Sequence, residues 1–193
     1  MSLIVGDDGR ARCAWGAGTP DYREYHDTEW GRPVHGDTAL FERVTLEAFQ
    51  SGLSWLTILR KRENFRAAFA GFDITAIAAF TDADRERLLA DAGIVRNRAK
   101  IDATITNARA LAAWQAVEGE GVLDHLVWSY AQAERLRPRA MADLAAQSVE
   151  SKALSKELKR RGFVFVGPTT MFAAMQAVGV VDDHVEGCWR VVP

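Results

Sequence analysis

The sequence predicts an all-α protein organised as one domain. Apolar residues recur at helical spacing in successive segments, and capping residues or glycines stand at the ends of most of these segments. Residues 163–166 read as extended, but so short a stretch is not enough to found a sheet. The sequence shows no internal repeat and no long Pro/Ser linker, so its 193 residues are most simply one unit with a sizeable core.

The helix expected over residues 38–50 shows this pattern most clearly. Leu40, Phe41 and Val44 follow the spacing of one helix face, and Asp37 is expected to cap the start. The same reasoning predicts further helices over residues 54–69, just after Asp73, from Thr81 to Gly93, over residues 97–116, from Ser148 or Ser151 to Gly162, and from Pro168 to Val178.

Composition is typical of a soluble globular protein, with 48% hydrophobic and 26% charged residues. No apolar run reaches the roughly 18 residues that a membrane span needs. The first ten residues are too short and too acidic for a secretory signal, so we expect a cytoplasmic protein without a membrane partner. The net charge of -2 argues against a strongly basic polyanion-binding protein, although local basic patches still allow contact with nucleic acid.

Both cysteines lie near the chain ends, and each has a histidine nearby. Cys13 precedes His26, and His184 precedes Cys188 by four residues, a spacing that places the latter two on one side of a helix. Two Cys and two His form the ligand set of a closed tetrahedral zinc site. The pattern favours one structural zinc ion that joins the two ends. The alternatives are a structural cysteine pair with ordinary histidines, or a Cys13–Cys188 disulfide, which a reducing compartment disfavours.

Glu47 stands on the apolar stripe of the helix over residues 38–50, where a carboxylate is costly to bury without a partner. It lies either at the edge of the stripe, near solvent or a core arginine, or in a pocket for a cationic or donor-rich ligand. Aromatic residues gather nearby in the sequence: Trp15, Tyr22, Tyr25, Trp30 and Trp55. Each alone suggests a core residue. Around a carboxylate, together they suit a flat, electron-poor ring that stacks and donates hydrogen bonds.

Residues 88–101 contain a tight turn between two expected helices. Gly93 turns the chain, and a new helix begins near Asn97. Backbone N–H groups at a helix start bind phosphate without reading base sequence. The general helix-hairpin-helix pattern has a second glycine where Val95 stands, and a plain αα-hairpin is the alternative. Phosphate binding is favoured by the basic residues around the turn, which are Arg96, Arg98 and Lys100.

Taken together, these segments resemble the 3-methyladenine DNA glycosylase I family. The resemblance covers about residues 11–190 and leaves residues 1–10 as an N-terminal extension without an assigned role, ahead of a single helical domain over 11–193. It rests on RCAW at 12–15, YREYHDTEWG at 22–31, LFERVTLEAFQSGLSWLTILRKRENFRAAF at 40–69, LLADAGIVRNRAKI at 88–101 and ALSKELKRRGFVFVGPTTMFAAMQAVGVVDDHVEGC at 153–188. It implies the all-α helix-hairpin-helix glycosylase fold, with two helical lobes around a base pocket. The family's own pattern also lacks the second hairpin glycine.

The resemblance further implies roles for individual residues. Glu47 would accept hydrogen bonds from the methylated adenine, and Trp15 and Trp55 would stack on it. The pocket wall would comprise the aromatic residues Trp15, Tyr22, Tyr25, Trp30 and Trp55. The zinc ion would be held by Cys13, His26, His184 and Cys188.

The implied activity is that of a DNA-3-methyladenine glycosylase in base-excision repair. Such an enzyme hydrolyses the N-glycosidic bond of 3-methyladenine in alkylated double-stranded DNA, releases the free base and leaves an abasic site, without a lyase step. Glu47 would act mainly through recognition and electrostatics, and activation of water is the second possibility. A non-catalytic helix-hairpin-helix DNA-binding module is the alternative class, and a metal-dependent hydrolase at the Cys/His site is a weaker one. The sequence implies no protein partner.

Overall fold

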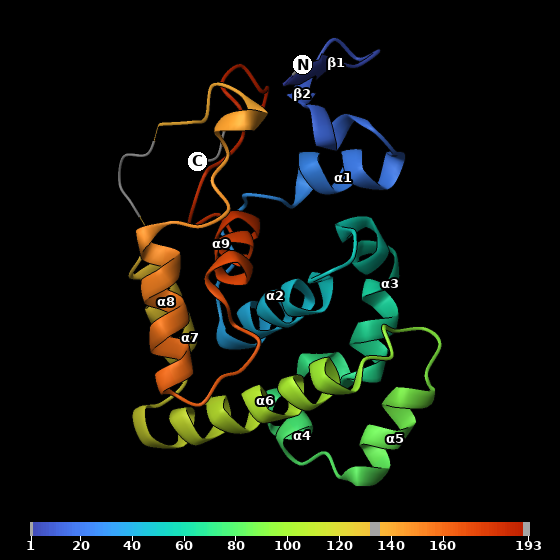
Figure 1. Cartoon of the computed structure of the whole chain (residues 1–193), viewed down its shortest axis with the longest axis vertical. Helices are drawn as coiled ribbons and strands as arrows, with labels where there is room; N and C mark the ends of the chain where they lie inside the picture. Colours follow the sequence, from blue (N-terminus) through green and yellow to red (C-terminus); the bar gives the residue numbers. More distant parts are fainter. Residues whose placement is uncertain (1, 132–135, 191–193) are drawn as a thin grey trace.

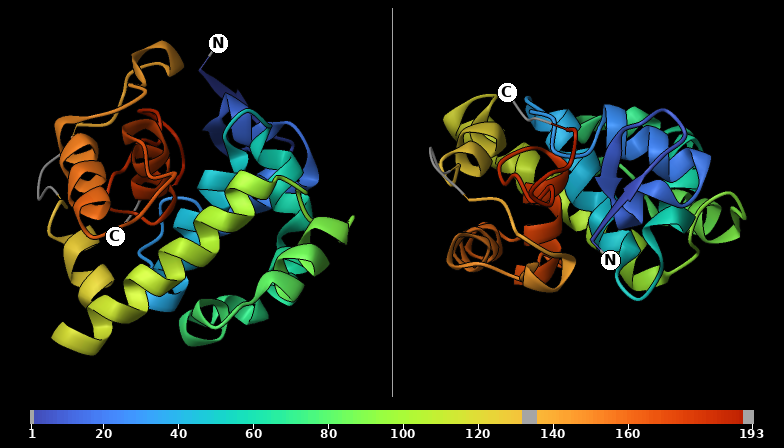
Figure 2. Two further views of the ribbon diagram at one scale, coloured as in Figure 1. Left: turned by 60° about the horizontal axis from the view of Figure 1, so that its bottom comes forward. Right: turned by 90° about the horizontal axis from the view of Figure 1, so that it is seen from above.

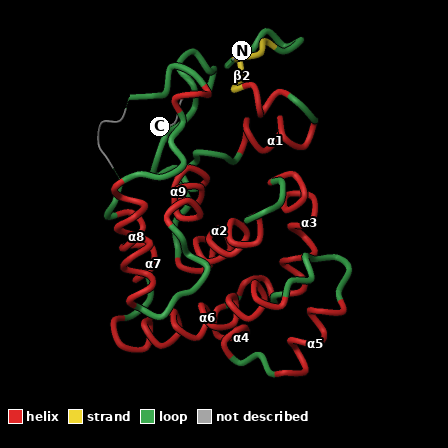
Figure 3. The backbone as a smooth tube through the Cα atoms, in the orientation of Figure 1, coloured by secondary structure: helices red, strands yellow, loops and turns green. Residues whose placement is uncertain are grey.

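The computed structural model describes residues 2–131 and 136–190, and these are mostly helical, as predicted (Figure 1, Figure 3). No helix in the described ranges is both long enough and apolar enough to cross a membrane. In chain order the elements are β1 (Leu3–Val5), β2 (Ala11–Cys13), η1 (Ala14–Ala17), α1 (Pro20–Thr28), α2 (Asp37–Gln50), α3 (Trp55–Ala68), η2 (Ala70–Phe72), α4 (Ile74–Ala78), α5 (Asp82–Ala90), α6 (Arg98–Glu118), α7 (Val122–Trp128), η3 (Met141–Asp143), α8 (Val149–Arg160) and α9 (Pro168–Ala177).

Local capping explains where several predicted helices begin. The side chains of Ser54, Asp73, Asn97 and Ser148 each accept a hydrogen bond from a backbone N–H in the first turn of α3, α4, α6 and α8, respectively. These bonds satisfy amides that have no partner within the helix. The predicted starts of these four helices are therefore confirmed.

Some features differ from expectation. Residues 163–166 form no strand, and Phe165 within them has a left-handed backbone with φ of 57°. The two strands of the described residues lie instead near the N-terminus, where β1 pairs antiparallel with β2. Helices α1 and α7 were not predicted from the apolar spacing. Asp37 is the first residue of α2, and Gly36 occupies the cap position.

Asp37 caps a different helix from the one that was expected. Its carboxylate accepts hydrogen bonds from the backbone N–H groups of Gly121, Leu123 and Asp124 at 2.9–3.0 Å, at the start of α7. The side-chain amide of Gln115 donates another at 2.7 Å. A negative charge also suits the positive end of the α7 dipole. One carboxylate thereby joins the start of α2 to α6 and α7.

Helix α2 lies inside the helical core (Figure 1). It contacts α3, α6, α7 and α9, and its side chains Phe41, Leu46 and Phe49 are fully buried. The long helix α6 runs along one side of the molecule, against α2, α4 and α5 (Figure 2). Side chains near the C-terminal end of α2 are therefore held on a rigid support.

The two ends of the chain meet on one side of the molecule (Figure 1). In the β1–β2 hairpin Leu3 pairs with Cys13. The amide of Trp189 donates a hydrogen bond to the carbonyl of Ala11 at 2.8 Å, and the amide of Val185 donates one to Cys13 Sγ at 3.3 Å. Residues that are far apart in sequence are thus brought side by side.

Replacing Asp37 with Ala is expected to destabilise the fold. The substitution leaves the α7 amides without their acceptor, and we expect the free energy of unfolding to fall by about 2 kcal/mol. Urea denaturation monitored by circular dichroism measures this. Asp82→Ala is the matched control, since Asp82 also begins a helix but is exposed. Equal losses for the two variants would contradict the role assigned to Asp37.

Candidate active site and metal centre

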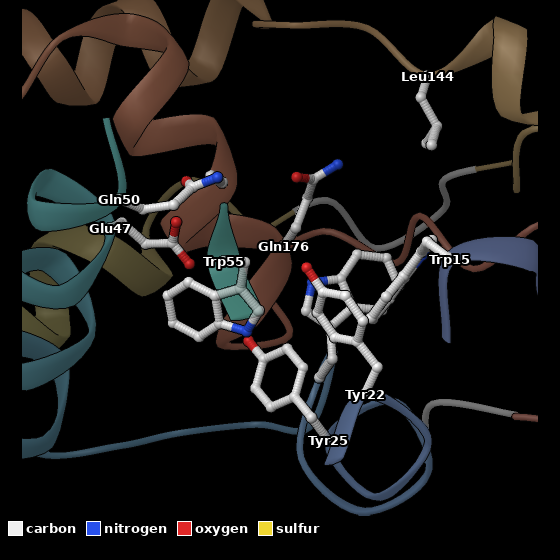
Figure 4. A pocket seen from close by; sticks show the side chains of 10 residues that line it. Trp15, Tyr22, Tyr25, Glu47, Gln50, Trp55, Leu144 and Gln176 are labelled. Atoms are coloured by element: carbon white, nitrogen blue, oxygen red, sulfur yellow. The ribbon is translucent and has the colours of Figure 1, made fainter. Parts of the chain in front are cut away.

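One cavity gathers the pocket residues that the sequence singled out. It has a volume of about 270 Å³ and lies between η1, α1, α2, α3 and α9. Its lining includes Glu47 and all five predicted aromatic residues: Trp15, Tyr22, Tyr25, Trp30 and Trp55. The close view shows the Glu47 carboxylate and several of these rings around a common space (Figure 4). Segments from four parts of the sequence thus converge on one site.

Glu47 places a carboxylate in this cavity with little access to solvent. Its exposed fraction is 6%, and no other described residue donates a hydrogen bond to it. Burial raises its pKa to about 8, and the charge of Arg43 only partly opposes that rise. Loss of water around the ionised form is the physical cause. Of the two interpretations of Glu47, the geometry therefore favours the pocket over the edge of the stripe.

The aromatic residues form a connected wall. Trp15 packs edge-on against Tyr22 and Trp30, with ring centroids 5.8 and 5.0 Å apart, and Tyr25 contacts Trp55 at 5.3 Å. Such edge-to-face contacts fix the rings relative to one another. Burial, followed by the charge of Glu47, raises the pKa of Tyr25, so its hydroxyl stays neutral and can donate a hydrogen bond.

Hydrogen bonding ties this wall to the helix beside it. The Tyr22 hydroxyl accepts a hydrogen bond from the backbone N–H of Leu56 at 3.1 Å, at the start of α3. That amide lies in the first turn of α3 and has no partner within its own helix. The position of Tyr22 is thereby coupled to that of Trp55, the first residue of α3.

Four further lining residues were not predicted: Gln50, Leu144, Ala173 and Gln176. Gln50 lies three residues after Glu47 on the same helix, so helical spacing carried a signal for it. Ala173 and Gln176 show the same spacing on α9, and Gln176 donates a hydrogen bond to Asp183 at 2.7 Å. Leu144 follows η3 in an irregular segment, where no periodic pattern indicates its direction.

Lys100 does not join the exposed basic group at the hairpin turn. It is buried, and its ammonium donates to the carbonyls of Phe49 and Ser51 at 2.8 and 2.5 Å, at the C-terminal end of α2. Burial lowers its pKa. The Lys100 ammonium is therefore bound to helix-end carbonyls and does not face solvent, and a contact of this residue with DNA stays a prediction. Lys100 holds the end of the helix that carries Glu47.

The other residues of the turn stay near the surface. Arg96 and Arg98 are exposed, and Arg98 pairs with Glu86 at 3.1 Å. The amide of Gly93 donates to the Asp91 carboxylate at 2.7 Å, and its carbonyl accepts from Lys61 at 3.1 Å. The α5–α6 turn is thus attached to α3, and two of its predicted basic residues face solvent.

The four predicted metal ligands form one buried cluster: Cys13, His26, His184 and Cys188. Cys188 Sγ lies 3.5 Å from His26 Nε2 and 3.7 Å from His184 Nδ1, and Cys13 Sγ lies 3.8 Å from His184 Nδ1. Ligands about 2.0–2.3 Å from a tetrahedral ion are roughly 3.3–3.8 Å apart. Both cysteines are free, so the disulfide alternative is wrong. Cys13, with smaller effects from the histidines, lowers the pKa of Cys188. The ligand atoms of all four residues lie within 4.8 Å of one another, so the cluster could hold a metal ion.

The outward nitrogen of each histidine has a partner. His26 Nδ1 lies 2.8 Å from a carboxylate oxygen of Asp27, and His184 Nε2 lies 3.3 Å from the carbonyl of Trp30. These bonds leave Nε2 of His26 and Nδ1 of His184 directed at the cysteines, as in metal sites where outer partners fix the ring. The cluster also supports the cavity wall, because the Trp15 ring lies 5.2 Å from the His26 ring and the Trp30 ring lies 4.6 Å from the His184 ring.

Comparison with known proteins identifies the family. The family model for methyladenine glycosylase matches residues 15–191. DNA-3-methyladenine glycosylase 1 of Escherichia coli (strain K12) is 47% identical over 179 residues, which are 92% of this chain and 95% of the relative. DNA-3-methyladenine glycosylase of Haemophilus influenzae is 42% identical, with 92% of this chain and 96% of the relative covered.

Solved structures agree with this match. A crystal structure of 3-methyladenine DNA glycosylase I superposes with a TM-score of 0.88 at 46% identity, covering 94% of this chain and all of the other. A structure describing 3-methyladenine recognition by the Staphylococcus aureus enzyme has a TM-score of 0.85 at 35% identity, covering 92% and 95%. The agreement in sequence and in fold extends over nearly the whole chain. The protein therefore belongs to the methyladenine glycosylase family.

Proposed function

We propose that this chain is a DNA-3-methyladenine glycosylase that hydrolyses the N-glycosidic bond of 3-methyladenine in alkylated DNA. The observation that carries the proposal is the Glu47 carboxylate, which is buried among aromatic rings and receives no hydrogen bond from the described residues. The names of the E. coli and H. influenzae relatives support it. The cavity volume of about 270 Å³ also supports it. Pockets for drug-sized ligands span roughly 300–1,000 Å³. A cavity slightly below this range suits a smaller ligand, such as a single base.

The reaction needs little covalent help from the protein. Methylation makes the base cationic, so the glycosidic electron pair can leave with it and neutralise its charge. Water bonds to the sugar carbon as a hydroxyl group and releases its other proton to solvent, and the products are the free base and an abasic site. No covalent bond to the protein is required, which agrees with a hydrolase that has no lyase step. The work of the site is then to select and hold the base.

Glu47 is suited to that selection. Burial raises its pKa to about 8 and so disfavours the charged form. A cationic, donor-rich base supplies the missing charge and hydrogen bonds, so the ionised carboxylate becomes favourable when such a base enters. A neutral base lacking those donors leaves the carboxylate unpaired. Recognition and electrostatics are therefore its main role, and activation of water is second.

The aromatic wall offsets the cost of exposing the base. Extruding a nucleotide from the duplex costs a few kcal/mol, and less for a damaged pair. Stacking on an aromatic ring contributes about 1–3 kcal/mol per base. Trp15 and Trp55 line the cavity from opposite sides of the Tyr22–Tyr25 segment, and we assign the stacking to them.

We assign contact with double-stranded DNA to the α5–α6 turn, in the manner of a helix-hairpin-helix. Arg96 and Arg98 are exposed there, and Gly93 keeps the turn tight, since a Cβ at this position would lie 2.9 Å from an oxygen of Asp91. The N-terminus of α6 adds backbone N–H groups and a favourable dipole for a phosphate. Contacts of this kind position the duplex without reading its sequence.

We further propose that the Cys/His cluster holds one structural zinc ion. Two sulfur and two nitrogen ligands complete a tetrahedron, so the zinc would have no open position for water. When bound, the ion would cross-link the N-terminal segment to the C-terminal segment. His26 and His184 would carry this constraint to Trp15 and Trp30 through direct ring contacts.

The cytoplasmic location stays a prediction.

Release of free bases from dimethyl-sulfate-treated duplex DNA tests the proposed activity. A non-catalytic DNA-binding module would bind the duplex and release no base. A metal-dependent hydrolase would lose activity in a zinc-free preparation that remains folded and still binds the base. The proposal requires release of 3-methyladenine, and its absence would contradict it.

Replacing Glu47 with Gln tests the role of the charge. The variant keeps the size of the side chain but removes the carboxylate, and we expect kcat on alkylated duplex to fall by roughly 10²-fold. Chromatography of the released bases measures this. Glu42→Gln is the control, because Glu42 lies on the same helix but pairs with Arg66 outside the cavity. Near-full activity of Glu47→Gln would show that the charge is not needed.

The same variant should change stability in a pH-dependent way. Glu47 in the folded protein holds its proton up to about pH 8, whereas its ordinary pKa is 4.5. Folding therefore becomes less favourable as pH rises from about 4.5 to about 8, because the unfolded chain releases that proton first. We expect Glu47→Gln to gain stability over the unmodified protein at pH 8 and not at pH 5, as measured by urea denaturation. Exposed Glu63→Gln is the control, and a gain independent of pH would contradict the account.

Removing the metal should loosen the cavity without removing a catalyst. After chelation of zinc we expect weaker binding of 3-methyladenine, a higher KM and altered tryptophan fluorescence, all restored by added zinc. Isothermal titration and steady-state kinetics distinguish this from a catalytic metal. Loss of kcat with unchanged affinity for the base would contradict a structural role.

A further inference from the structure

Arg12 is a fully buried arginine next to the Cys/His cluster. Its exposed fraction is 2%, and its guanidinium contacts two carboxylates. Nε and Nη2 donate to Asp27 at 2.7–3.0 Å, and Nη1 and Nη2 donate to Asp8 at 2.8 and 2.5 Å. A buried charge is tolerated when paired and hydrogen-bonded in this way, and the planar fork of arginine suits two carboxylates. Arg12 therefore joins Asp8 to Asp27.

Asp27 continues this chain of contacts to a metal ligand. One of its oxygens lies 2.8 Å from His26 Nδ1. The indole N–H of Trp189, the residue after Cys188, donates to the same oxygen at 3.3 Å. In metal sites a carboxylate that accepts from the outer histidine nitrogen fixes the ring and its tautomer. Arg12 holds that carboxylate in place and thereby sets the direction of His26 Nε2.

Asp8 comes from the loop that connects β1 and β2. The pairing of Ile4 with Arg12 and of Val5 with Ala11 brings this loop back over β2. Gly6 allows the close approach, since a Cβ there would lie 2.8 Å from Arg12 Nη1 and 2.9 Å from Asp8 Oδ1. The glycine at position 6 thus leaves room for the Asp8–Arg12 pair.

The hairpin also covers the cluster with apolar and aromatic contacts. Leu3 and Trp189 pack against the small core that contains Cys13 and Cys188. The guanidinium of Arg10 lies 4.2 Å from the centroid of the Trp189 ring, a cation–π contact. Asp8 and Arg12 precede residue 15, where the match to the family model begins. The hairpin part of this cover lies before the residues that the family model matches, whereas Trp189 lies within them.

We propose that the N-terminal hairpin, residues 2–13, is an integral part of the metal centre. Its Asp8–Arg12 pair acts as a positioning device that locks His26 through Asp27, and its surface shields the ion from chelators. This inference rests on the proposed zinc site. It gives a role to residues 2–10 of the N-terminal extension, which the sequence left without one.

Zinc release from the full-length, zinc-loaded chain tests the proposal. Asp8→Asn removes the outermost charge, and Asp7→Asn is the matched control, because Asp7 is an exposed neighbour in the same loop. With a chromogenic chelator in excess, we expect Asp8→Asn to release zinc about tenfold faster than Asp7→Asn, at the lower end of the effect of outer-shell substitutions. Arg12→Lys keeps the positive charge but loses the planar guanidinium that donates to both Asp8 and Asp27. This variant should release zinc faster than Asp8→Asn.

A second readout separates positioning from general destabilisation. Nitrogen NMR of the zinc-loaded chain should show a sharp, slowly exchanging His26 Nδ1–H signal in Asp7→Asn and a broadened, faster-exchanging one in Asp8→Asn. Equal release rates and an unchanged ring signal would overturn the inference while leaving the zinc site intact. If the unmodified chain binds no zinc, the zinc proposal itself fails, and this inference fails with it. If Arg12→Lys does not fold, the Asp8 and Asp7 pair decides the outcome alone.

Discussion

The cavity depends on four buried side chains that join the two ends of the chain. Cys13 and His26 come from the first segment, and His184 and Cys188 from the last. The rings of Trp15 and Trp30 pack directly on the two histidines, so this junction fixes one wall of the cavity. Few apolar side chains are available here, because the local core is a small cluster separate from the main one. Contacts among the cysteine, histidine and aromatic side chains therefore hold this junction together in place of a large apolar core.

The opposite wall is organised around the unfavourable burial of Glu47. A carboxylate without a donor costs stability, and helix α2 tolerates it because Phe41 and Phe49 on the same helix are completely buried. Lys100 fixes the end of the helix through the carbonyls of Phe49 and Ser51. The carboxylate at the end of this supported helix lies in the cavity without a donor from the described residues. In the proposed function, the ligand brings the missing positive charge and donors.

Local features were predictable from the sequence, and features that depend on distant partners were not. Ser54 and Asn97 cap helices through bonds within a few residues, so their roles can be read from the sequence. Asp37 carries the same type of signal, yet its carboxylate bonds the start of α7 more than 80 residues later. From the sequence, Lys100 is expected to be an exposed basic residue at the hairpin turn. Its burial against the end of α2 is evident only in the folded structure.

The candidate site shows the same division. The gathering of the Cys/His cluster and of the Glu47–aromatic set was predictable because their residue types are chemically distinctive. Leu144 was not, since it reaches the cavity from an irregular segment after η3. The part played by Arg12 requires the hairpin register and the place of Asp27, which only the folded structure provides.

Titration of Glu47 by carbon NMR, without and with 3-methyladenine, tests most directly whether its buried charge selects the base. The account predicts a pKa of about 8 in the empty cavity and a clear decrease when the base is bound, because a donor-rich ligand favours the ionised form. A pKa near the ordinary value of 4.5 in the free protein, or one that 3-methyladenine leaves unchanged, would contradict it.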